Sequence, residues 1–469
     1  MLGSVWFDEI SRERDLWIER NQYYYNFIER LVKFNVPEEV KVLEVGCGTG
    51  NLIGNLRNRL RVGIDFSRKM IQVAKRKVKN VKFVNLDVER DEIPERFDWI
   101  LAINLVGYLS DVYRTFERLK KNCSTETRVM VVYYNHLWEP LLRMGEHFGL
   151  RSRQPEQNWL GIDDLKNIFE LLDYDIVRVG YHILLPFDIP LFSQFVNNFI
   201  ASLPILKHFS LVQTLILRLK PTGRCDYSVS IIVPVRNEEG NVSKIIEMIP
   251  RFGNRQEVIF VEGHSKDESW REIEKIKEKY KKKNLSRLMI KAFKQFGEGK
   301  ADAVRMGFDK ASGEILIILD ADLTVDPSEL VKFYDAIASG KAEFVNGSRL
   351  VYPMEKDAMR FLNKVGNRAF SAFFTFIFGQ RFKDTLCGTK AIMKKDYQRI
   401  KRILADWGRF DPFGDFDLIF GAVRLNLKIL EMPVRYRERE YGVSNISRIK
   451  HGWLLIKMAC LAFCKLVWI

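Results

Sequence analysis

The chain contains the stretch Ile315-Leu316-Ile317-Ile318-Leu319-Asp320-Ala321-Asp322. A continuous run of large apolar residues is typical of a parallel strand that helices cover on both faces. The two acids after it would project together at the carboxyl edge of the sheet, where α/β proteins bind their ligands. The stretch therefore predicts an α/β fold with a polar site at that edge. The alternative is a polar strand end before the helix near Pro327.

Carboxylates at this spacing suit a divalent metal ion. Mg²⁺ or Mn²⁺ usually takes one or two carboxylates together with phosphate oxygens. Such an ion neutralises the charge that develops on a departing diphosphate. We therefore predict that Asp320 and Asp322 hold Mg²⁺ or Mn²⁺ as a cofactor.

Two further apolar stretches, residues 229–233 and 257–261, lie upstream of this one. Both stretches are typical of buried parallel strands. The first runs into a loop that carries Pro234, Arg236 and Glu238, and the second ends at Glu262.

Seven motifs follow one another in this half of the chain: Pro234-x-Arg-Asn-Glu238, the turn at Glu262, Gly299-Lys-Ala301, Asp320-Ala-Asp322-Leu, Asn346-Gly-Ser-Arg349, Asp384-Thr-Leu-Cys-Gly-Thr-Lys390 and Arg435-Tyr-Arg437-x-Arg439-x-x-Gly442-x-Ser444. In these motifs, residues 225–450 resemble the family 2 glycosyltransferases of the GT-A fold, especially the dolichol- or polyprenyl-phosphate mannose and glucose synthases. One departure is Gly263, which stands where the family commonly has a second acid.

The resemblance implies a role for each matching residue. Asp320 would face the ribose and the metal, and Asp322 would ligate the metal as a catalytic residue. The remaining donor-binding residues would be Pro234, Arg236, Glu238 and Glu262, with Glu262 facing the base. Lys300, Arg349, Arg437 and Arg439 would surround the diphosphate and an anionic acceptor, and we count Arg437 as catalytic. The planar fork of arginine suits phosphate, although each of these could equally be a surface ion-pair partner.

The loop Phe413-Gly-Asp415-Phe-Asp417-Leu lies where such enzymes keep a carboxylate near the acceptor. If the acceptor is a hydroxyl, Asp417 would act as its general base. If it is a phosphate, Asp417 would only orient it. We favour Asp417 over Asp415 because an apolar run follows it. The alternative is a helix N-terminus, where acids stabilise the dipole.

Residues 41–50 read Lys-Val-Leu-Glu-Val-Gly-Cys-Gly-Thr-Gly, a strand-like run with three glycines at alternating positions. Glycine lets the backbone approach a ligand where a Cβ would clash. A second apolar stretch ends at Asp65, whose carboxylate could accept hydrogen bonds from both hydroxyls of a ribose. This order of strand, glycine loop, helix, strand and acid is that of a nucleoside-binding α/β fold.

With the third element at 81–87 and the strand at 97–104, residues 40–135 resemble the class I S-adenosylmethionine-dependent methyltransferases. The resemblance implies that S-adenosylmethionine contacts Glu44, Gly46 and Gly48 with its methionine end, Asp65 with its ribose and Asp87 with its adenine, while Asn104 borders the methyl-transfer site. The alternative is a fold that senses the cofactor or acts as a scaffold without methylating. We interpret Tyr133, Tyr134 and His136 as an aromatic cap rather than as acceptor-binding groups.

The expected organisation is a methyltransferase-like domain over 1–180, apolar linker helices over 181–224, the glycosyltransferase domain over 225–450 and an amphipathic helix over 451–469. The linker would pack between the domains or lie in a membrane interface. In 359–378, Lys364, Arg368, Ser371 and Thr375 share one narrow face and leave a wide apolar face. Lys450, Lys457 and Lys465 form a similar stripe. Both helices predict peripheral membrane contact, with a dimer interface as the alternative.

The net charge of +15 favours anionic partners. Nucleic acid is not expected, because the lysines of 266–283 alternate with glutamates and lack base-stacking aromatics. The six cysteines have no metal-site or disulfide spacing, and the sequence leads us to expect neither a signal peptide nor a transmembrane helix. We expect a cytoplasmic protein, peripheral on the cytosolic face of a membrane.

The sequence thus predicts a metal-dependent, inverting hexosyltransferase fused to a methyltransferase. Its donor would be a nucleotide-diphosphate sugar and its acceptor lipid-linked, with polyprenyl phosphate favoured. The alternative is transfer to a sugar hydroxyl during polysaccharide assembly, with a first domain that senses the cofactor or acts as a scaffold.

Overall fold

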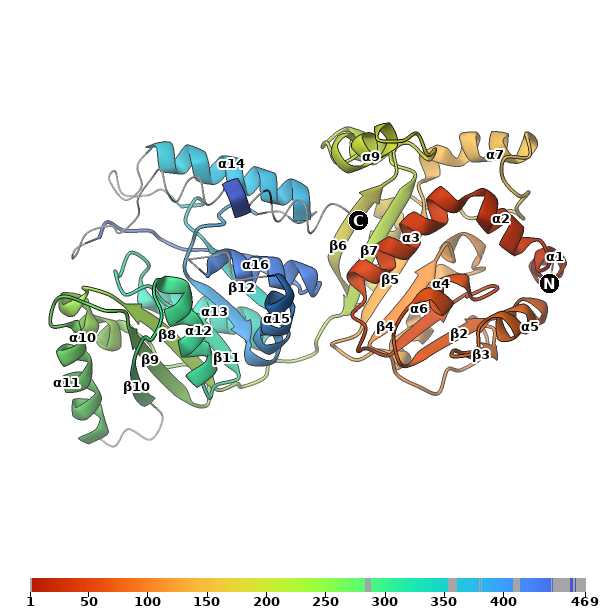
Figure 1. Cartoon of the computed structure of the whole chain (residues 1–469). Coiled ribbons are helices and arrows are strands. Elements are labelled where there is room, and N and C mark those ends of the chain that lie inside the picture. The colour runs from red at the N-terminus through yellow and green to blue at the C-terminus, as the bar shows by residue number, and fades with distance from the viewer. Residues whose placement is uncertain are drawn as a thin grey trace. The chain divides into compact units, whose positions relative to one another are not determined.

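The computed structural model describes residues 2–282, 288–352, 361–378, 380, 382–407, 414–439, 441, 456–458 and 460 (Figure 1). The chain forms two compact units, one ending at Lys220 and the other beginning at Pro221. Each unit holds a seven-stranded mixed sheet with helices on its faces. The predicted α/β fold class is therefore confirmed for both.

The sheet of the first unit has the order β3-β2-β1-β4-β5-β7-β6. Five strands are parallel to one another: β1 (Val42–Val45), β2 (Arg61–Asp65), β3 (Lys82–Asn85), β4 (Trp99–Ile103) and β5 (Arg128–Tyr134). Strand β7 (Val212–Leu219) lies between β5 and β6 (Tyr174–His182) and runs antiparallel to both. The glycine loop and Asp65 thus leave the same edge of the sheet.

Helices cover both faces of this sheet. One face packs against α3 (Gln22–Asn35), α4 (Asn51–Asn55) and α5 (Arg68–Lys77), and the other against α6 (Val112–Leu119) and α8 (Ile162–Leu171). Neighbouring residues of β1 belong to opposite cores, with Val42 in the first and Leu43 in the second. This alternation follows from the two-residue period of a strand. Two more helices, α1 (Leu2–Ile10) and α2 (Arg14–Arg20), precede α3.

The structure differs from the expected linker over 181–224. The expected boundary at 180 lies inside β6, and β7 belongs to the first sheet. Between these strands lie only short helical segments, α9 (Phe192–Phe195), η4 (Val196–Ile200) and η5 (Leu206–Phe209). Sequence periodicity could not reveal this arrangement, because pairing between β5 and β7 joins residues that are far apart in the chain.

The sheet of the second unit has the order β10-β9-β8-β11-β13-β12-β14. Its strands are β8 (Val229–Val235), β9 (Gln256–Glu262), β10 (Leu288–Lys294), β11 (Ile315–Ile318), β12 (Phe344–Ser348), β13 (Lys390–Met393) and β14 (Ile429–Pro433). Only β13 runs antiparallel to its neighbours. The carboxyl ends of β8, β9, β11 and β12 therefore share an edge with the amino end of β13.

Helices flank this second sheet as well. On one face α10 (Glu239–Met248), α11 (Ser269–Lys282) and α13 (Leu330–Ala338) contribute to a single buried core. The others are α12 (Lys300–Lys310), α15 (Lys394–Trp407) and α16 (Asp415–Arg424). Gly307 of α12 lies so close to Ile232 of β8 that a Cβ would clash, which brings this helix directly onto the sheet.

The helix expected at 359–378 is α14 (Phe361–Phe378). Its Phe374 and Phe378 are fully buried, and both rings approach Phe420 of α16 to 5.6 Å between centroids. Ser371, expected on a polar surface stripe, is 3% exposed. Part of the apolar face is therefore used for packing within the unit. The side chain of Lys364 and most of the helix expected at 451–469 lie outside the described residues.

Within the described ranges, none of the helices combines the length and hydropathy that a membrane span requires.

Candidate active sites

The carboxyl edge of the second sheet gathers the predicted donor-binding residues. Asp320 and Asp322 follow β11, Glu238 follows β8, Glu262 ends β9, and Arg349 follows β12. Buried strands place the backbone at this edge, and the polar side chains begin where the strands end. The location is the one at which α/β sheets bind their ligands.

Asp320 is paired with Lys300 at the first position of α12. The Lys300 ammonium lies 2.6 Å from Asp320 Oδ1. Burial alone would raise the pKa of Asp320, but Lys300 outweighs it and holds that pKa below its usual range. The backbone of Gly388 lies directly against this pair, and a Cβ there would overlap both side chains. Only glycine fits this position.

Asp322 is held from two sides. Its Oδ2 accepts a hydrogen bond of 2.6 Å from Arg439, and its Oδ1 accepts one of 2.8 Å from the Thr324 hydroxyl. Arg439 also lies 3.9 Å from Glu238. Burial raises the pKa of Glu238 to about 7, against the opposing effects of Asn241 and Arg439. The loop after β14 thus brings a guanidinium to the carboxylates after β11 and β8.

Arg349 is fixed by Asp384, which begins one of the family motifs but received no role in the sequence analysis. Its Nε and Nη2 donate to Asp384 over 2.7 and 2.9 Å, and its guanidinium carbon lies 5.2 Å from the centroid of the Tyr436 ring. Asn367 of α14 donates a third side-chain hydrogen bond to Asp384, of 2.7 Å. These partners overcome the effect of burial and hold the pKa of Asp384 well below its usual range.

The two acids at the start of α16 have different partners. Asp415 is 5% exposed and lies 3.1 Å from the ammonium of Lys390. Against the effect of burial, Asp320 and, to a smaller extent, Asp415 raise the pKa of Lys300. Asp417 accepts a hydrogen bond of 3.3 Å from Arg305 of α12. Asp415 thus acts on Lys300, the partner of Asp320, whereas the favoured candidate Asp417 contacts the next turn of α12.

The other predicted residues lie at this edge with fewer contacts. Arg437 is half-exposed, pairs with Asp326 at 3.1 Å, and donates its backbone N–H to Thr324. Arg236 is exposed, and Pro234 is half-buried in β8. Glu262 is buried and accepts the backbone N–H of Ser265 over 2.5 Å. Gly263, which stands where the resembling family commonly has a second acid, faces the Gln295 amide.

The donor set fits a divalent cation in its chemistry. Asp320 and Asp322 offer hard oxygen ligands, and Mg²⁺ or Mn²⁺ needs only one or two carboxylates when a diphosphate supplies the others. In the described part of the chain, no group of three or more His, Cys, Asp or Glu side chains could hold a metal without such help. One oxygen of each acid already contacts Lys300 or Arg439, so these cations would share the carboxylates with the metal.

The first unit has its own candidate site at the carboxyl edge of β1, β2 and β4. Gly46, Gly48 and Gly50 all adopt positive φ, and a Cβ on Gly48 would meet no atom within 4 Å. The glycine loop therefore leaves open space beside its backbone. Asp65 accepts the backbone N–H groups of Gly48 and Ser67 over 2.8 and 2.9 Å, which fixes its carboxylate at the end of β2. This cradle fits a nucleoside cofactor such as S-adenosylmethionine.

The remaining residues predicted for this site are also placed by the structure. Glu44 is buried beneath the loop, accepts the backbone N–H of Ile53 over 3.1 Å, and has its pKa raised by burial to about 8. Asp87 accepts the backbone N–H of Glu89 over 3.0 Å in the turn after β3. Asn104 adopts a positive φ of 53° after β4.

The N-terminal helices supply residues that sequence reasoning missed. Asp15 of α2 accepts hydrogen bonds of 2.6 and 2.7 Å from Thr49 and Asn51 of the glycine-loop segment. Asp8 of α1 accepts one of 2.5 Å from Ser67. These acids carry no local motif, and only the fold brings them to the loop. The helices thus cover the cofactor edge of the sheet.

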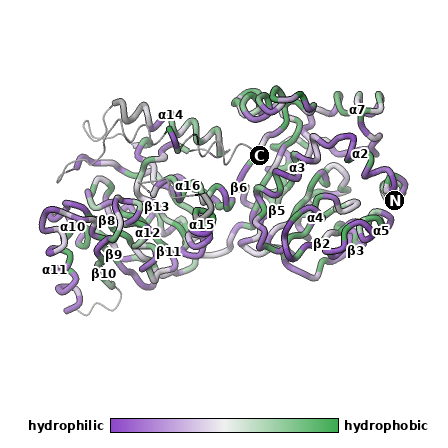
Figure 2. Tube along the Cα trace, in the orientation of Figure 1, coloured by the Kyte–Doolittle hydropathy of each residue, from purple (hydrophilic) through white to green (hydrophobic). Residues whose placement is uncertain are grey.

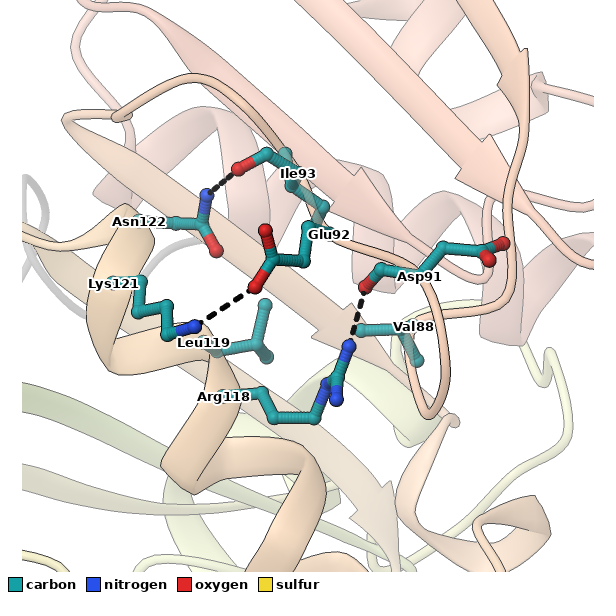
Figure 3. A pocket seen from close by; sticks show the side chains of 8 residues that line it. All are labelled: Val88, Asp91, Glu92, Ile93, Arg118, Leu119, Lys121 and Asn122. Atoms are coloured by element: carbon teal, nitrogen blue, oxygen red, sulfur yellow. Dashed lines mark hydrogen bonds and ion pairs between the residues drawn. The ribbon is translucent and has the colours of Figure 1, made fainter.

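A small cavity of about 50 Å³ lies elsewhere in this unit (Figure 3). It is formed by the segment between β3 and β4 and by residues at the end of α6. Its basic side chains have local partners, since Lys121 pairs with Glu92 at 2.9 Å and Arg118 donates to the Asp91 carbonyl over 2.9 Å. We therefore assign no ligand to it.

The comparisons with known proteins agree with this geometry. Residues 230–400 match the family model for Glycosyl transferase family 2, and residues 42–125 match the model for a Methyltransferase domain. The protein therefore combines a family 2 glycosyltransferase domain with a methyltransferase domain, as the sequence predicted.

Three curated relatives illustrate the likeness. A dolichol-phosphate mannosyltransferase of Pyrococcus furiosus is 32% identical over 125 residues, which are 26% of this chain and 33% of the relative. A UDP-N-acetylglucosamine–dolichyl-phosphate N-acetylglucosaminyltransferase of Methanococcus voltae is 25% identical over 249 residues, or 50% of this chain and 97% of the relative. A malonyl-[acyl-carrier protein] O-methyltransferase of Bacillus anthracis is 32% identical over 100 residues, or 20% of this chain and 37% of the relative. The chain thus spans about a third of the first and third relatives.

Proposed function

We propose that the second unit transfers a hexose, with inversion, from a nucleotide-diphosphate sugar to a lipid-linked acceptor, with polyprenyl phosphate favoured. The observation that carries this proposal is the arrangement of Asp320 and Asp322 with Lys300, Arg349 and Arg439 at one sheet edge. Cations in this density suit a diphosphate donor and an anionic acceptor. Two of the relatives described above act on dolichyl phosphate by name.

Each group in the site then has a task. Glu238 and Glu262 hold the nucleoside, while Lys300 and Arg439 neutralise diphosphate oxygens. Mg²⁺ or Mn²⁺ bound by Asp320 and Asp322 would stabilise the charge on the departing nucleoside diphosphate. Arg349, held in one orientation by Asp384, offers its remaining N–H groups to the acceptor phosphate.

An acceptor phosphate is already ionised and needs no general base. The surroundings of α16 support this choice over a sugar hydroxyl, because Asp415 and Asp417 both face basic side chains. Transfer to a hydroxyl would instead require one of these acids to accept a proton.

For the first unit we propose S-adenosylmethionine-dependent methylation of the same glycan or its lipid. The open space beside Gly48 and the fixed carboxylate of Asp65 support cofactor binding. Catalysis is favoured over a scaffold or sensing role because the expected residues from Glu44 to Asn104 all lie at one edge of the sheet.

We further propose peripheral contact between the first unit and a membrane. Residues 137–150 and 187–209 hold more than half of the large apolar side chains that the described residues expose, and Figure 2 shows the apolar stretch around α9. Leu191 is 82% exposed and Phe192 is 55% exposed. Exposed apolar patches of this extent mark interaction or membrane surfaces. Short amphipathic helices of this kind can lie in a bilayer interface.

The glycosyltransferase proposal is tested with a panel of nucleotide-diphosphate sugars, Mn²⁺ and polyprenyl phosphate. We expect one donor to be consumed with formation of a polyprenyl-phosphate sugar, and EDTA to stop the reaction. Turnover only with soluble saccharide acceptors would favour transfer to a sugar hydroxyl. Turnover in the presence of EDTA would contradict the proposed dependence on a metal ion.

A further inference from the structure

Four phenols meet beside Asn104 in the first unit. The tyrosine cluster consists of Tyr24 and Tyr25 of α3, Tyr108 of η1 (Val106–Tyr108) and Tyr134 at the end of β5, which the sequence analysis interpreted only as part of an aromatic cap. The Tyr24 ring stacks on Tyr134 at 5.4 Å and meets Tyr25 edge-on at 5.2 Å. The Tyr24 hydroxyl donates to Asn104 Oδ1 over 2.8 Å. The cluster therefore lies where the transferred methyl group is expected.

Arg14 of α2 faces this cluster. Its guanidinium carbon lies 5.8 Å from the Tyr25 ring centroid, and its side chain is half-buried. The phenols, Tyr25 foremost, raise the pKa of Arg14 against the opposing effect of burial. Among the described residues, no carboxylate forms a direct ion pair with Arg14. Asp65 is close enough that Arg14 opposes the rise in the pKa of Asp65 that burial causes. A partly desolvated cation without a direct ion-pair partner is unfavourable, so a ligand anion is expected beside it.

A second arginine at the cluster already has a partner. Arg151 lies over the Tyr134 ring at 5.1 Å, but its Nη1 is 2.7 Å from Glu146 Oε1. The Tyr108 hydroxyl donates to Gln154 over 2.6 Å, on the same side of the cluster. Of the two arginines, Arg14 is therefore the one without a direct ion-pair partner.

The cluster contains no group suited to remove a proton near neutral pH. Burial raises the pKa of Tyr24, Tyr108 and Tyr134 above the ordinary value for a phenol, so these side chains stay protonated. Glu146, the carboxylate joined to it through Arg151, is held in that ion pair. An alcohol acceptor would need a base here. A carboxylate is already ionised and needs none.

We propose that the methyl acceptor is a carboxylate, which Arg14 binds as its counter-ion and which the hydroxyls of the tyrosine cluster orient. This inference rests on the proposed methyltransferase activity. A carboxylate oxygen forms a bond to the methyl carbon while the methyl–sulfur bond breaks, and the electron pair of that bond stays on sulfur. The negative charge of the acceptor and the positive charge of the sulfonium disappear together. The product is a methyl ester, and no proton moves.

The test uses the full chain and two sugars that differ only at one carbon. p-Nitrophenyl β-glucuronide carries a carboxylate where p-nitrophenyl β-glucoside carries a hydroxymethyl group. In calorimetry on protein saturated with S-adenosylhomocysteine, we expect the glucuronide to bind and the glucoside not to bind. Arg14→Gln should weaken glucuronide binding at least tenfold, and Arg14→Lys should restore part of it. Arg12→Gln, an exposed arginine two residues away, is the matched control and should change nothing.

With S-adenosylmethionine labelled in the methyl group, the glucuronide should acquire a label that mild base releases as methanol. A base-stable label, methylation of the glucoside alone, or no methylation of either sugar would each overturn the proposal. A further experiment compares the binding of S-adenosylhomocysteine with that of methylthioadenosine, which lacks the amino-acid carboxylate. If Arg14→Gln weakens the binding of S-adenosylhomocysteine only, Arg14 binds the cofactor and the acceptor assignment is wrong. If the wild type binds neither of these two nucleosides, the proposed methyltransferase function itself is wrong.

Discussion

Arg349 and Asp384 form a two-pronged ion pair in which Nε and Nη2 of the arginine donate to separate carboxylate oxygens over 2.7 and 2.9 Å. Asp384 is fully buried, and it also accepts the side-chain amide of Asn367. Helix α14 is thereby joined to an arginine of the candidate donor and acceptor site. The pair orients the free edge of the guanidinium before any substrate arrives, which is how fixed donors assist transfer reactions.

Asp384→Asn should impair both stability and sugar transfer. Removing one partner of a buried ion pair typically costs about 3–5 kcal/mol because the other charge is left uncompensated. We therefore expect a lower unfolding midpoint in urea and a fall in kcat of at least tenfold. Asp335→Asn breaks the exposed pair with Arg224 and serves as the control, with little effect expected on either quantity. Full activity in Asp384→Asn would show that Arg349 needs no such orientation.

Asp322→Ala should abolish sugar transfer while the fold stays intact. The metal would lose a ligand, and stabilisation of the leaving diphosphate is worth several kcal/mol. The measurement is transfer at saturating Mn²⁺, with circular dichroism to confirm folding. Asp309→Ala, which removes an exposed partner of Lys401, is the control. Transfer by Asp322→Ala within tenfold of wild type in metal-free buffer would refute the metal assignment.

Asp65→Ala should weaken S-adenosylmethionine binding strongly, because the carboxylate at the end of β2 would no longer receive the ribose hydroxyls. Calorimetry on the full chain should give a micromolar dissociation constant for the wild type and at least tenfold weaker binding for the variant. Asp322→Ala should bind as the wild type does, since its change lies in the other unit. If the wild type releases or absorbs no heat on addition of S-adenosylmethionine, both the proposed cofactor and the proposed methylation are contradicted.

Glu44 gives the stability of the first unit a specific pH dependence. Burial raises its pKa from 4.5 to about 8 in the folded protein. Between these values the folded state keeps a proton that the unfolded state has lost, so this residue makes the unit less stable as pH rises from about 4.5 to 8. Glu44→Gln should therefore stabilise the cofactor-free protein at pH 8 but not at pH 4.5. The measurement is the melting temperature of both proteins across this range, where about 1 kcal/mol corresponds to roughly 2–4 °C. Parallel curves for the two proteins would show that Glu44 ionises normally.

The exposed residues around α9 should govern membrane binding. Replacing Leu191, Phe192 and Phe195 with serine removes apolar area that is worth about 25 cal/mol per Å² when it leaves water. We expect the wild type to sediment with anionic vesicles and the triple variant to remain largely in the supernatant. Leu171→Ser, which alters a side chain 73% exposed on α8, is the matched control. A wild type that stays in solution at low salt would contradict peripheral membrane contact.

The sequence predicted the parts of each site that follow a strand directly. Asp320, Asp322, Glu262 and Asp65 could be placed because an apolar run and the acid after it are local signals. Asp384, Asp15 and Arg14 could not, since each is brought to its site by contacts between residues far apart in the chain. The same limit explains why the structure differs from the expected linker over 181–224. Strand β7 is apolar, but its place between β5 and β6 depends on long-range pairing. Which acid of α16 serves the acceptor stays a prediction.

The place of β7 also determines how the first unit can be expressed and how late it can fold. Strand β6 has no partner in the sheet until residues 212–219 have been synthesised, because β7 separates it from β5. A fragment that stops near residue 180 would leave β5 with an open edge and β6 unpaired, and exposed strand edges favour aggregation. A separately produced methyltransferase fragment must therefore extend to residue 220. On the ribosome, closure of this sheet must wait for the very segment that precedes the glycosyltransferase domain.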